Sequence, residues 1–84
     1  MKKIEIYTTG LCGYCFAAKR LLDSKGAEYN EIRVDKLPER RPEMEERSGR
    51  RTVPQVFLEG THLGGYDDLA RLDHAGELDS MLEA

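Results

Sequence analysis

The only two cysteines of the chain, Cys12 and Cys15, lie three positions apart in the segment TTGLCGYC. An alternating, β-branched segment at 3–8 precedes them, and a helical pattern at 13–25 follows them. The first sulfur should therefore lie at a helix N-terminus, where unpaired N–H groups and the helix dipole stabilise a thiolate and lower the pKa of a thiol. We predict that Cys12 is the nucleophile of thiol–disulfide exchange. Cys15, one turn further along and more buried, is the predicted resolving thiol.

Two other uses of the cysteines compete with this hypothesis. A structural zinc site needs four ligands, usually in two close pairs, and only His62 and His74 could join the cysteines. These histidines are twelve positions apart and lack finger-like spacing. We expect His62 on the surface of a strand and His74 at a helix end, where the dipole favours it. The second alternative is a pair of inert core thiols. Their place in a glycine-containing turn at a helix start favours the redox hypothesis over both.

The elements around the cysteines alternate between strand and helix patterns in the order β-α-β-α-β-β-α, which indicates an α/β fold. The first β-α-β unit should place its two strands in parallel through a right-handed crossover. The last two strands should form an antiparallel hairpin. We predict strands at 3–8, 29–35, 53–58 and 62–64, and helices at 13–25, at 38–48 and from about 67 to 82, the last one split in two near 73–76. The buried stripe expected on the first helix consists of Phe16, Ala17, Leu21 and Leu22.

Length and charge limit the classes of function. A chain of 84 residues supports one domain, which we assign to residues 1–84. The net charge of −3 is too small to indicate a nucleic-acid partner. The charge is unevenly placed, with a balance of +3 over residues 1–54 and −6 over residues 55–84, so a ligand carrying both signs could use it.

The segment after Met1 carries two lysines but no apolar run, so we expect neither a signal peptide nor a membrane partner. We therefore predict a cytoplasmic protein. A structural disulfide is unusual in a reducing cytoplasm, and this also favours the redox hypothesis.

With the β-α-β unit, CGYC at 12–15, TVP at 52–54 and GGYDDL at 64–69 together, the sequence resembles the glutaredoxins, and in particular the small bacterial dithiol type. The resemblance extends from Ile4 to about Leu82. It implies a thioredoxin-like fold with a central mixed four-stranded sheet. It also implies a glutathione-dependent thiol–disulfide oxidoreductase that reduces protein disulfides and glutathione mixed disulfides. The implied partners are glutathione and disulfide-containing or glutathionylated proteins, and we expect a monomer.

The same resemblance implies a glutathione site. The Val53–Pro54 bond would be cis and face Cys12, so that the backbone of Val53 could pair with an extended peptide. From the residues alone, a plain proline at the start of a strand is equally compatible. The turn before Asp67 and Asp68 would hold the γ-glutamyl end, and either aspartate could also cap the helix. The expected glutathione-binding residues are Tyr14, Arg51, Thr52, Val53, Pro54, Gly65, Asp67 and Asp68.

The sequence departs from the family pattern at two positions. Thr9 stands where the family usually has a lysine, and Arg50 and Arg51 could replace that charge in part. Gly13 stands where the commonest dithiol pattern has proline, which should shift the reduction potential. Some glutaredoxins with this glycine hold a [2Fe-2S] cluster between two subunits, with a thiolate such as that of Cys12 as ligand. This is the second hypothesis, whereas the main one needs no metal. A third is a thioredoxin-reductase-dependent electron donor for ribonucleotide reductase, against which the glutathione motifs argue.

Overall fold

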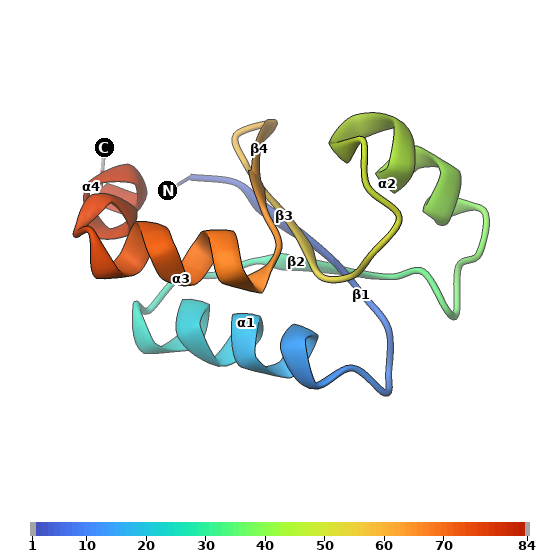
Figure 1. The fold of residues 1–84 in the computed structure, drawn as a ribbon, viewed down its shortest axis with the longest axis horizontal. Coiled ribbons are helices and arrows are strands. Elements are labelled where there is room, and N and C mark those ends of the chain that lie inside the picture. The colour runs from blue at the N-terminus through green and yellow to red at the C-terminus, as the bar shows by residue number, and fades with distance from the viewer. Residues whose placement is uncertain (1, 84) are drawn as a thin grey trace.

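The computed structural model describes residues 2–83 and shows a four-stranded sheet with helices on both faces (Figure 1). No helix in this part of the chain is long and apolar enough to span a bilayer. The elements are β1 (Ile4–Thr8), α1 (Gly13–Ser24), β2 (Asn30–Arg33), α2 (Arg40–Ser48), β3 (Gln55–Leu58), β4 (Thr61–Gly64), α3 (Tyr66–His74) and α4 (Glu77–Glu83).

The strands follow the order β2-β1-β3-β4 across the sheet. β1 pairs with β2 in parallel, and β3 is antiparallel to both β1 and β4. This confirms the predicted β-α-β unit, the terminal hairpin and the mixed four-stranded sheet.

Alternation along β1 builds a core on each face of the sheet. Ile4 and Ile6 face α1, α3 and α4 and pack with Leu22 and Leu69, among others. Tyr7 faces the other way and packs with Met44 of α2 and with residues of β2 and β3. Because side chains alternate along a strand, both faces of β1 are buried, and the strand that leads to Cys12 is firmly held from both sides.

The buried stripe of α1 differs from the predicted one. Cys15, Ala18 and Leu22 are buried, at spacings of three and four that place them on one helix face. Phe16 keeps 59% of its surface exposed, and the Arg20 guanidinium lies over its ring, 5.7 Å from the centroid. The prediction is confirmed for Leu22, and Leu21 packs at the edge of the core, but it is wrong for Phe16. Cys15 takes the inward position in the first turn and turns Phe16 outward.

Several boundaries also differ. β2 ends at Arg33, whose carbonyl accepts hydrogen bonds from the N–H groups of Lys36 and Leu37, so the backbone turns away at this point. α2 begins at Arg40, because Pro38 lies in a preceding turn. The predicted division of the C-terminal helix is confirmed, with Gly76 at φ +76° between α3 and α4, a left-handed conformation that suits glycine.

Candidate active site

Cys12 is the N-cap residue of α1. Its backbone is extended, at φ −144° and ψ 104°, and its sulfur accepts a hydrogen bond from the Cys15 N–H at 3.0 Å. An N-cap side chain takes up one of the unpaired N–H groups of the first turn, and here a sulfur has that role. Cys15 is 1% exposed and Cys12 is half-buried, which confirms the predicted difference in burial. The two sulfurs form a disulfide, so the structure shows the oxidised form of the pair.

The loop that presents Cys12 is held by residues at and just beyond the end of β2. The Asp35 carboxylate accepts the Gly10 N–H at 3.0 Å, and Arg33 donates two hydrogen bonds to the same carboxylate, at 2.8 and 2.7 Å. The Arg33 guanidinium, followed by the Gly10 N–H, holds the pKa of Asp35 well below its usual range. A Cβ added at Gly10 would overlap the end of the flexible Arg33 side chain, so a larger residue there would displace the guanidinium.

The loop before β3 faces the cysteines. The Val53–Pro54 bond is cis, as the resemblance implied, and the Val53 carbonyl oxygen lies 3.9 Å from the Cys12 sulfur. The buried Gln55 side chain supports this loop by donating from Nε2 to the Thr52 carbonyl at 3.0 Å.

The other end of the Gln55 amide meets His62, whose Nε2 lies 2.7 Å from Gln55 Oε1. His62 is therefore half-buried and not a surface residue as predicted. Burial, reinforced by the charge of Arg50, lowers the pKa of His62.

The turn between β4 and α3 forms the opposite wall. Gly65 is the N-cap of α3, and its N–H donates to Asp68 Oδ2 at 3.0 Å, so one carboxylate oxygen closes the start of the helix. Gly64 has a φ of +117°, and a Cβ there would overlap the Asp68 carboxylate. A Cβ at Gly65 would lie 3.3 Å from the Pro54 carbonyl oxygen, so the two walls approach closely at this point.

Asp68 is the most heavily paired acid of the site. Besides the Gly65 N–H, it accepts hydrogen bonds from Arg50 at 2.7 Å and from Arg71 at 3.2 Å. The Arg50 guanidinium, followed by the Gly65 N–H, lowers the pKa of Asp68 to about 2. The carboxylate is therefore ionised at neutral pH, and it also caps the helix, as the sequence allowed.

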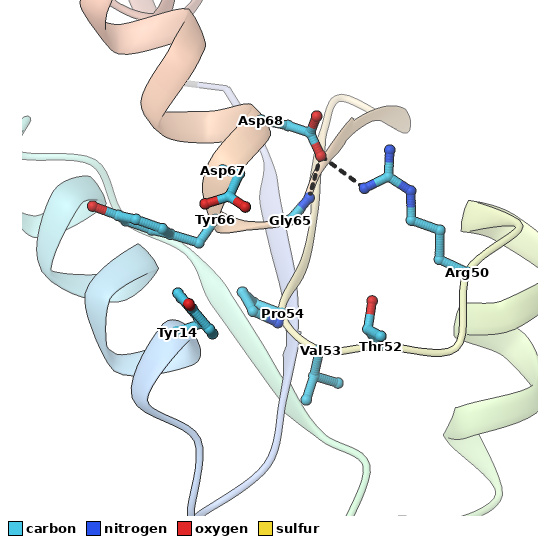
Figure 2. A pocket seen from close by; sticks show the side chains of 9 residues that line it. All are labelled: Tyr14, Arg50, Thr52, Val53, Pro54, Gly65, Tyr66, Asp67 and Asp68. Carbon is cyan, nitrogen blue, oxygen red and sulfur yellow. Dashed lines mark hydrogen bonds and ion pairs between the residues drawn. The ribbon is translucent and has the colours of Figure 1, made fainter.

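These segments enclose a pocket of about 300 Å³ (Figure 2). Neither cysteine lines it, but Val53, whose carbonyl oxygen lies 3.9 Å from the Cys12 sulfur, does. Tyr14, which is 66% exposed, and Tyr66 form an aromatic wall, with ring centroids 6.1 Å apart. Arg50 and Asp68 lie on the other side of the pocket. The lining residues are Tyr14, Arg50, Thr52, Val53, Pro54, Gly65, Tyr66, Asp67 and Asp68.

The structure brings together all but one of the residues predicted to bind glutathione. The exception is Arg51, which is exposed and does not line the pocket, and whose carbonyl accepts a hydrogen bond from Arg41 at 2.9 Å. Arg50 and Tyr66 line the pocket without having been among the predicted binding residues. Tyr66 could have been found, because it stands inside the GGYDD segment. Arg50 was considered only as a possible replacement for the missing lysine, and no periodicity distinguishes it from Arg51.

We searched residues 2–83 for side chains that could together bind a metal ion. Among residues 2–83, no three or more His, Cys, Asp or Glu side chains gather in a way that could hold a metal ion. His62 is engaged with Gln55, and His74 lies in the last turn of α3 as expected.

Comparison with known proteins decides the family, because the glutaredoxin family model matches residues 4–63. The chain belongs to the glutaredoxin family. It is 49% identical to glutaredoxin 3 of Escherichia coli strain K12 over 83 residues, which cover 99% of this chain and 100% of that protein. It is 48% identical to a glutaredoxin of Pseudomonas aeruginosa over the full length of both chains.

Solved structures of glutaredoxins share the fold of this glutaredoxin. A glutaredoxin of Brucella melitensis, 54% identical, matches with a TM-score of 0.86 over 98% of this chain and 89% of that one. A buckwheat glutaredoxin in complex with glutathione, 33% identical, matches with a TM-score of 0.90 over 98% of this chain and 77% of that one. The thioredoxin-like fold is thereby confirmed, as is the family-level function of a glutathione-dependent thiol–disulfide oxidoreductase.

Proposed function

We propose that this glutaredoxin reduces glutathione mixed disulfides and protein disulfides, with Cys12 as the nucleophile and Cys15 as the resolving thiol. The observation that carries the proposal is the position of the Cys12 sulfur. It caps α1, accepts the Cys15 N–H at 3.0 Å and lies 3.9 Å from the carbonyl of Val53, which lines a pocket with charges of both signs. A sulfur in this position is favoured as the anion once the disulfide is reduced.

In the monothiol route, the Cys12 thiolate attacks the glutathione sulfur of a mixed disulfide. The new Cys12–glutathione disulfide forms as the old bond breaks, and the substrate leaves as its thiolate. A second glutathione thiolate then attacks the glutathione sulfur of this adduct, releasing oxidised glutathione and the Cys12 thiolate. The Cys15 N–H supports the charge on Cys12 at the start and end of this cycle.

In the dithiol route, Cys12 forms a mixed disulfide with one sulfur of the substrate. Cys15 then attacks the Cys12 sulfur, the substrate leaves fully reduced, and a Cys12–Cys15 disulfide remains. The oxidised pair of the structure corresponds to this product. Glutathione reopens it in two further exchanges.

The pocket residues have separate roles in holding the glutathione moiety. The backbone of Val53 pairs with the cysteinyl part as an added strand would, and Thr52 and Pro54 shape that wall. The N–H of Asp67 in the first turn of α3 suits the carboxylate of the γ-glutamyl end, whereas the Gly65 N–H is already bonded to Asp68. The Asp68 carboxylate suits the ammonium group of the same end. Tyr14 covers the bound tripeptide from the α1 side. The geometry gives no comparable support to the proposed role of Arg51.

We further propose that the protein acts in the cytoplasm as a single-domain monomer, on glutathionylated or disulfide-containing proteins. The hypotheses of a shared [2Fe-2S] cluster and of thioredoxin-reductase dependence stay predictions of the sequence. Size-exclusion chromatography after anaerobic purification with iron and glutathione addresses the cluster, since a coloured dimer would support it. Assays coupled to glutathione reductase and to thioredoxin reductase address the electron source.

Replacing each cysteine separately tests the assignment of roles. We expect Cys12→Ser to abolish reduction of both glutathionylated and disulfide substrates, because no nucleophile remains. Cys15→Ser should keep deglutathionylation and lose the dithiol route. Turnover is measured in a glutathione-reductase-coupled assay with one substrate of each kind. Substantial activity of Cys12→Ser, or loss of deglutathionylation in Cys15→Ser, would refute the assignment.

A further inference from the structure

Arg50 reaches from the loop between α2 and β3 to the far wall of the pocket, where its Nη1 donates to Asp68 Oδ2 at 2.7 Å (Figure 2). Its backbone is anchored, because the Arg50 N–H donates to Ser48 Oγ at 3.0 Å, and the Ser48 hydroxyl donates in turn to the Met44 carbonyl of α2 at 2.7 Å. Gly49 closes α2 in a left-handed conformation and directs the chain into this turn. The fold therefore places a cation at the pocket end opposite the tyrosines.

Both members of the pair keep unused hydrogen-bonding capacity. A guanidinium has five N–H donors, and the Arg50 side chain uses one of them among residues 2–83, with 47% of its surface exposed. A carboxylate offers about four acceptor sites, and Asp68 uses three of them, on Gly65, Arg50 and Arg71. One further donor can thus reach Asp68 while an acceptor reaches Arg50.

This arrangement complements a group that carries an ammonium and a carboxylate on one carbon. A lone amine would meet the charge of Arg50, and a lone carboxylate would meet the charge of Asp68. Only a group with both charges can pair with Arg50 and Asp68 at once, and the planar fork of arginine suits a carboxylate. The α-amino-acid end of a γ-glutamyl peptide is such a group.

The geometry points to Arg50 as a specificity-determining residue that binds the α-carboxylate of a γ-glutamyl ligand, so that Arg50 and Asp68 together select its zwitterionic end. The inference rests on the proposed function and adds a residue to its glutathione site. The plain alternative is that Arg50 only completes a surface ion pair with Asp68.

The test uses three tripeptides that differ only at this end. They are glutathione, 4-aminobutanoyl-cysteinylglycine, which lacks the α-carboxylate, and glutaryl-cysteinylglycine, which lacks the amino group. Each is presented as its mixed disulfide with thionitrobenzoate to the reduced Cys15→Ser protein. Cys12 then forms a disulfide with the tripeptide sulfur, and the released thionitrobenzoate anion is followed by its absorbance, which gives a second-order rate constant.

We expect glutathione to react at least about tenfold faster than either analogue, as for the loss of a hydrogen bond to a charged group. Arg50→Gln should slow glutathione to about the rate of the compound without the carboxylate, and should leave that compound nearly unchanged. Asp68→Asn should remove the discrimination against the compound without the amino group. Arg50→Lys keeps the charge without the fork and should fall between Arg50→Gln and the parent protein.

Arg71→Gln is the matched control, since Arg71 contacts the other oxygen of Asp68 and does not line the pocket. It should keep the rate ratio between glutathione and the compound without the carboxylate. The inference is overturned if Arg50→Gln retains that ratio, or if Arg71→Gln abolishes it equally, because Arg50 would then act only through Asp68. Thermal unfolding of each variant verifies that it is folded. If the parent protein reacts no faster with the glutathione compound than with that of 2-mercaptoethanol, the proposed function fails as well.

Discussion

At the scale of single residues, Asp68 combines two tasks that are usually separate. Its Oδ2 accepts hydrogen bonds from the Gly65 N–H and from the Arg50 guanidinium, so one atom caps the start of α3 and also pairs with a cation of the pocket. The side chain is only 24% exposed, which limits screening by solvent. Loss of this carboxylate should therefore affect both the stability of the fold and the binding of the ligand.

The low pKa of Asp68 predicts how its contribution to stability depends on pH. A carboxyl group with a pKa of about 2 in the folded protein, against 3.8 ordinarily, stabilises the fold fully above about pH 4. This contribution is lost as the pH falls toward 2. We expect Asp68→Asn to lower the free energy of unfolding by about 1 kcal/mol at pH 7, and the deficit to shrink as the pH approaches 2.

Denaturant titrations of both proteins between pH 7 and the acid limit measure this deficit. Asp67→Asn is the neighbouring control, because the Asp67 side chain is exposed, and its effect on unfolding should stay small throughout. A deficit for Asp68→Asn that is independent of pH would contradict the role of the ionised carboxylate.

At the scale of elements, α1 owes its position to one buried face that begins with the resolving cysteine. Leu22 is 1% exposed within the core shared by α1, α3 and the sheet, whereas Phe16 points to solvent. Truncation at the two positions should therefore have very different costs, although both are large apolar residues.

We expect Leu22→Ala to lower the free energy of unfolding by about 2–5 kcal/mol, since it leaves a cavity in the core. Phe16→Ala should cost less than about 1 kcal/mol, because its exposed ring loses little burial. Chemical denaturation of both variants measures these costs. Equal losses in the free energy of unfolding would indicate that Phe16 is as buried as Leu22, as the sequence pattern predicted.

The sequence predicted most of the elements because their signals are local. Alternation marked β1, glycine marked the helix ends, and the CGYC and GGYDDL segments marked the site. Contacts between residues far apart in the chain could not be predicted from these local patterns. The Gly10 N–H bonds to the Asp35 side chain, which the pattern placed in a strand, and His62, which the pattern placed on the surface, is half-buried and bonded to Gln55. The reach of Arg50 to Asp68 is of the same kind, because only the closed fold brings positions 50 and 68 together.

At the scale of the whole molecule, the basic and the acidic parts of the chain both contribute side chains to the pocket. Arg50 comes from the part with a balance of +3, and Asp67 and Asp68 come from the part with a balance of −6. The fold thus places both signs beside one ligand site, and interactions of partly exposed charges weaken as salt rises.

We expect the reaction with a glutathione mixed disulfide to slow by a few fold, about two- to fivefold, between roughly 0.05 and 0.5 M salt. The mixed disulfide of uncharged 2-mercaptoethanol is the control and should change less. Rate constants for the two compounds, measured across the same salt series, give the comparison. Equal salt dependence would show that the charged walls do not contact the ligand.

The most direct test of the account is the titration of the reduced Cys12 thiol. In the Cys15→Ser protein, the rate of alkylation by iodoacetamide is followed across pH. The helix N-terminus and the N–H of residue 15 predict a midpoint clearly below the value of about 8.5 for an ordinary thiol, with fast alkylation at neutral pH. A midpoint at or above that of an ordinary thiol, or a sulfur that resists alkylation, would contradict the assignment of Cys12 as the nucleophile.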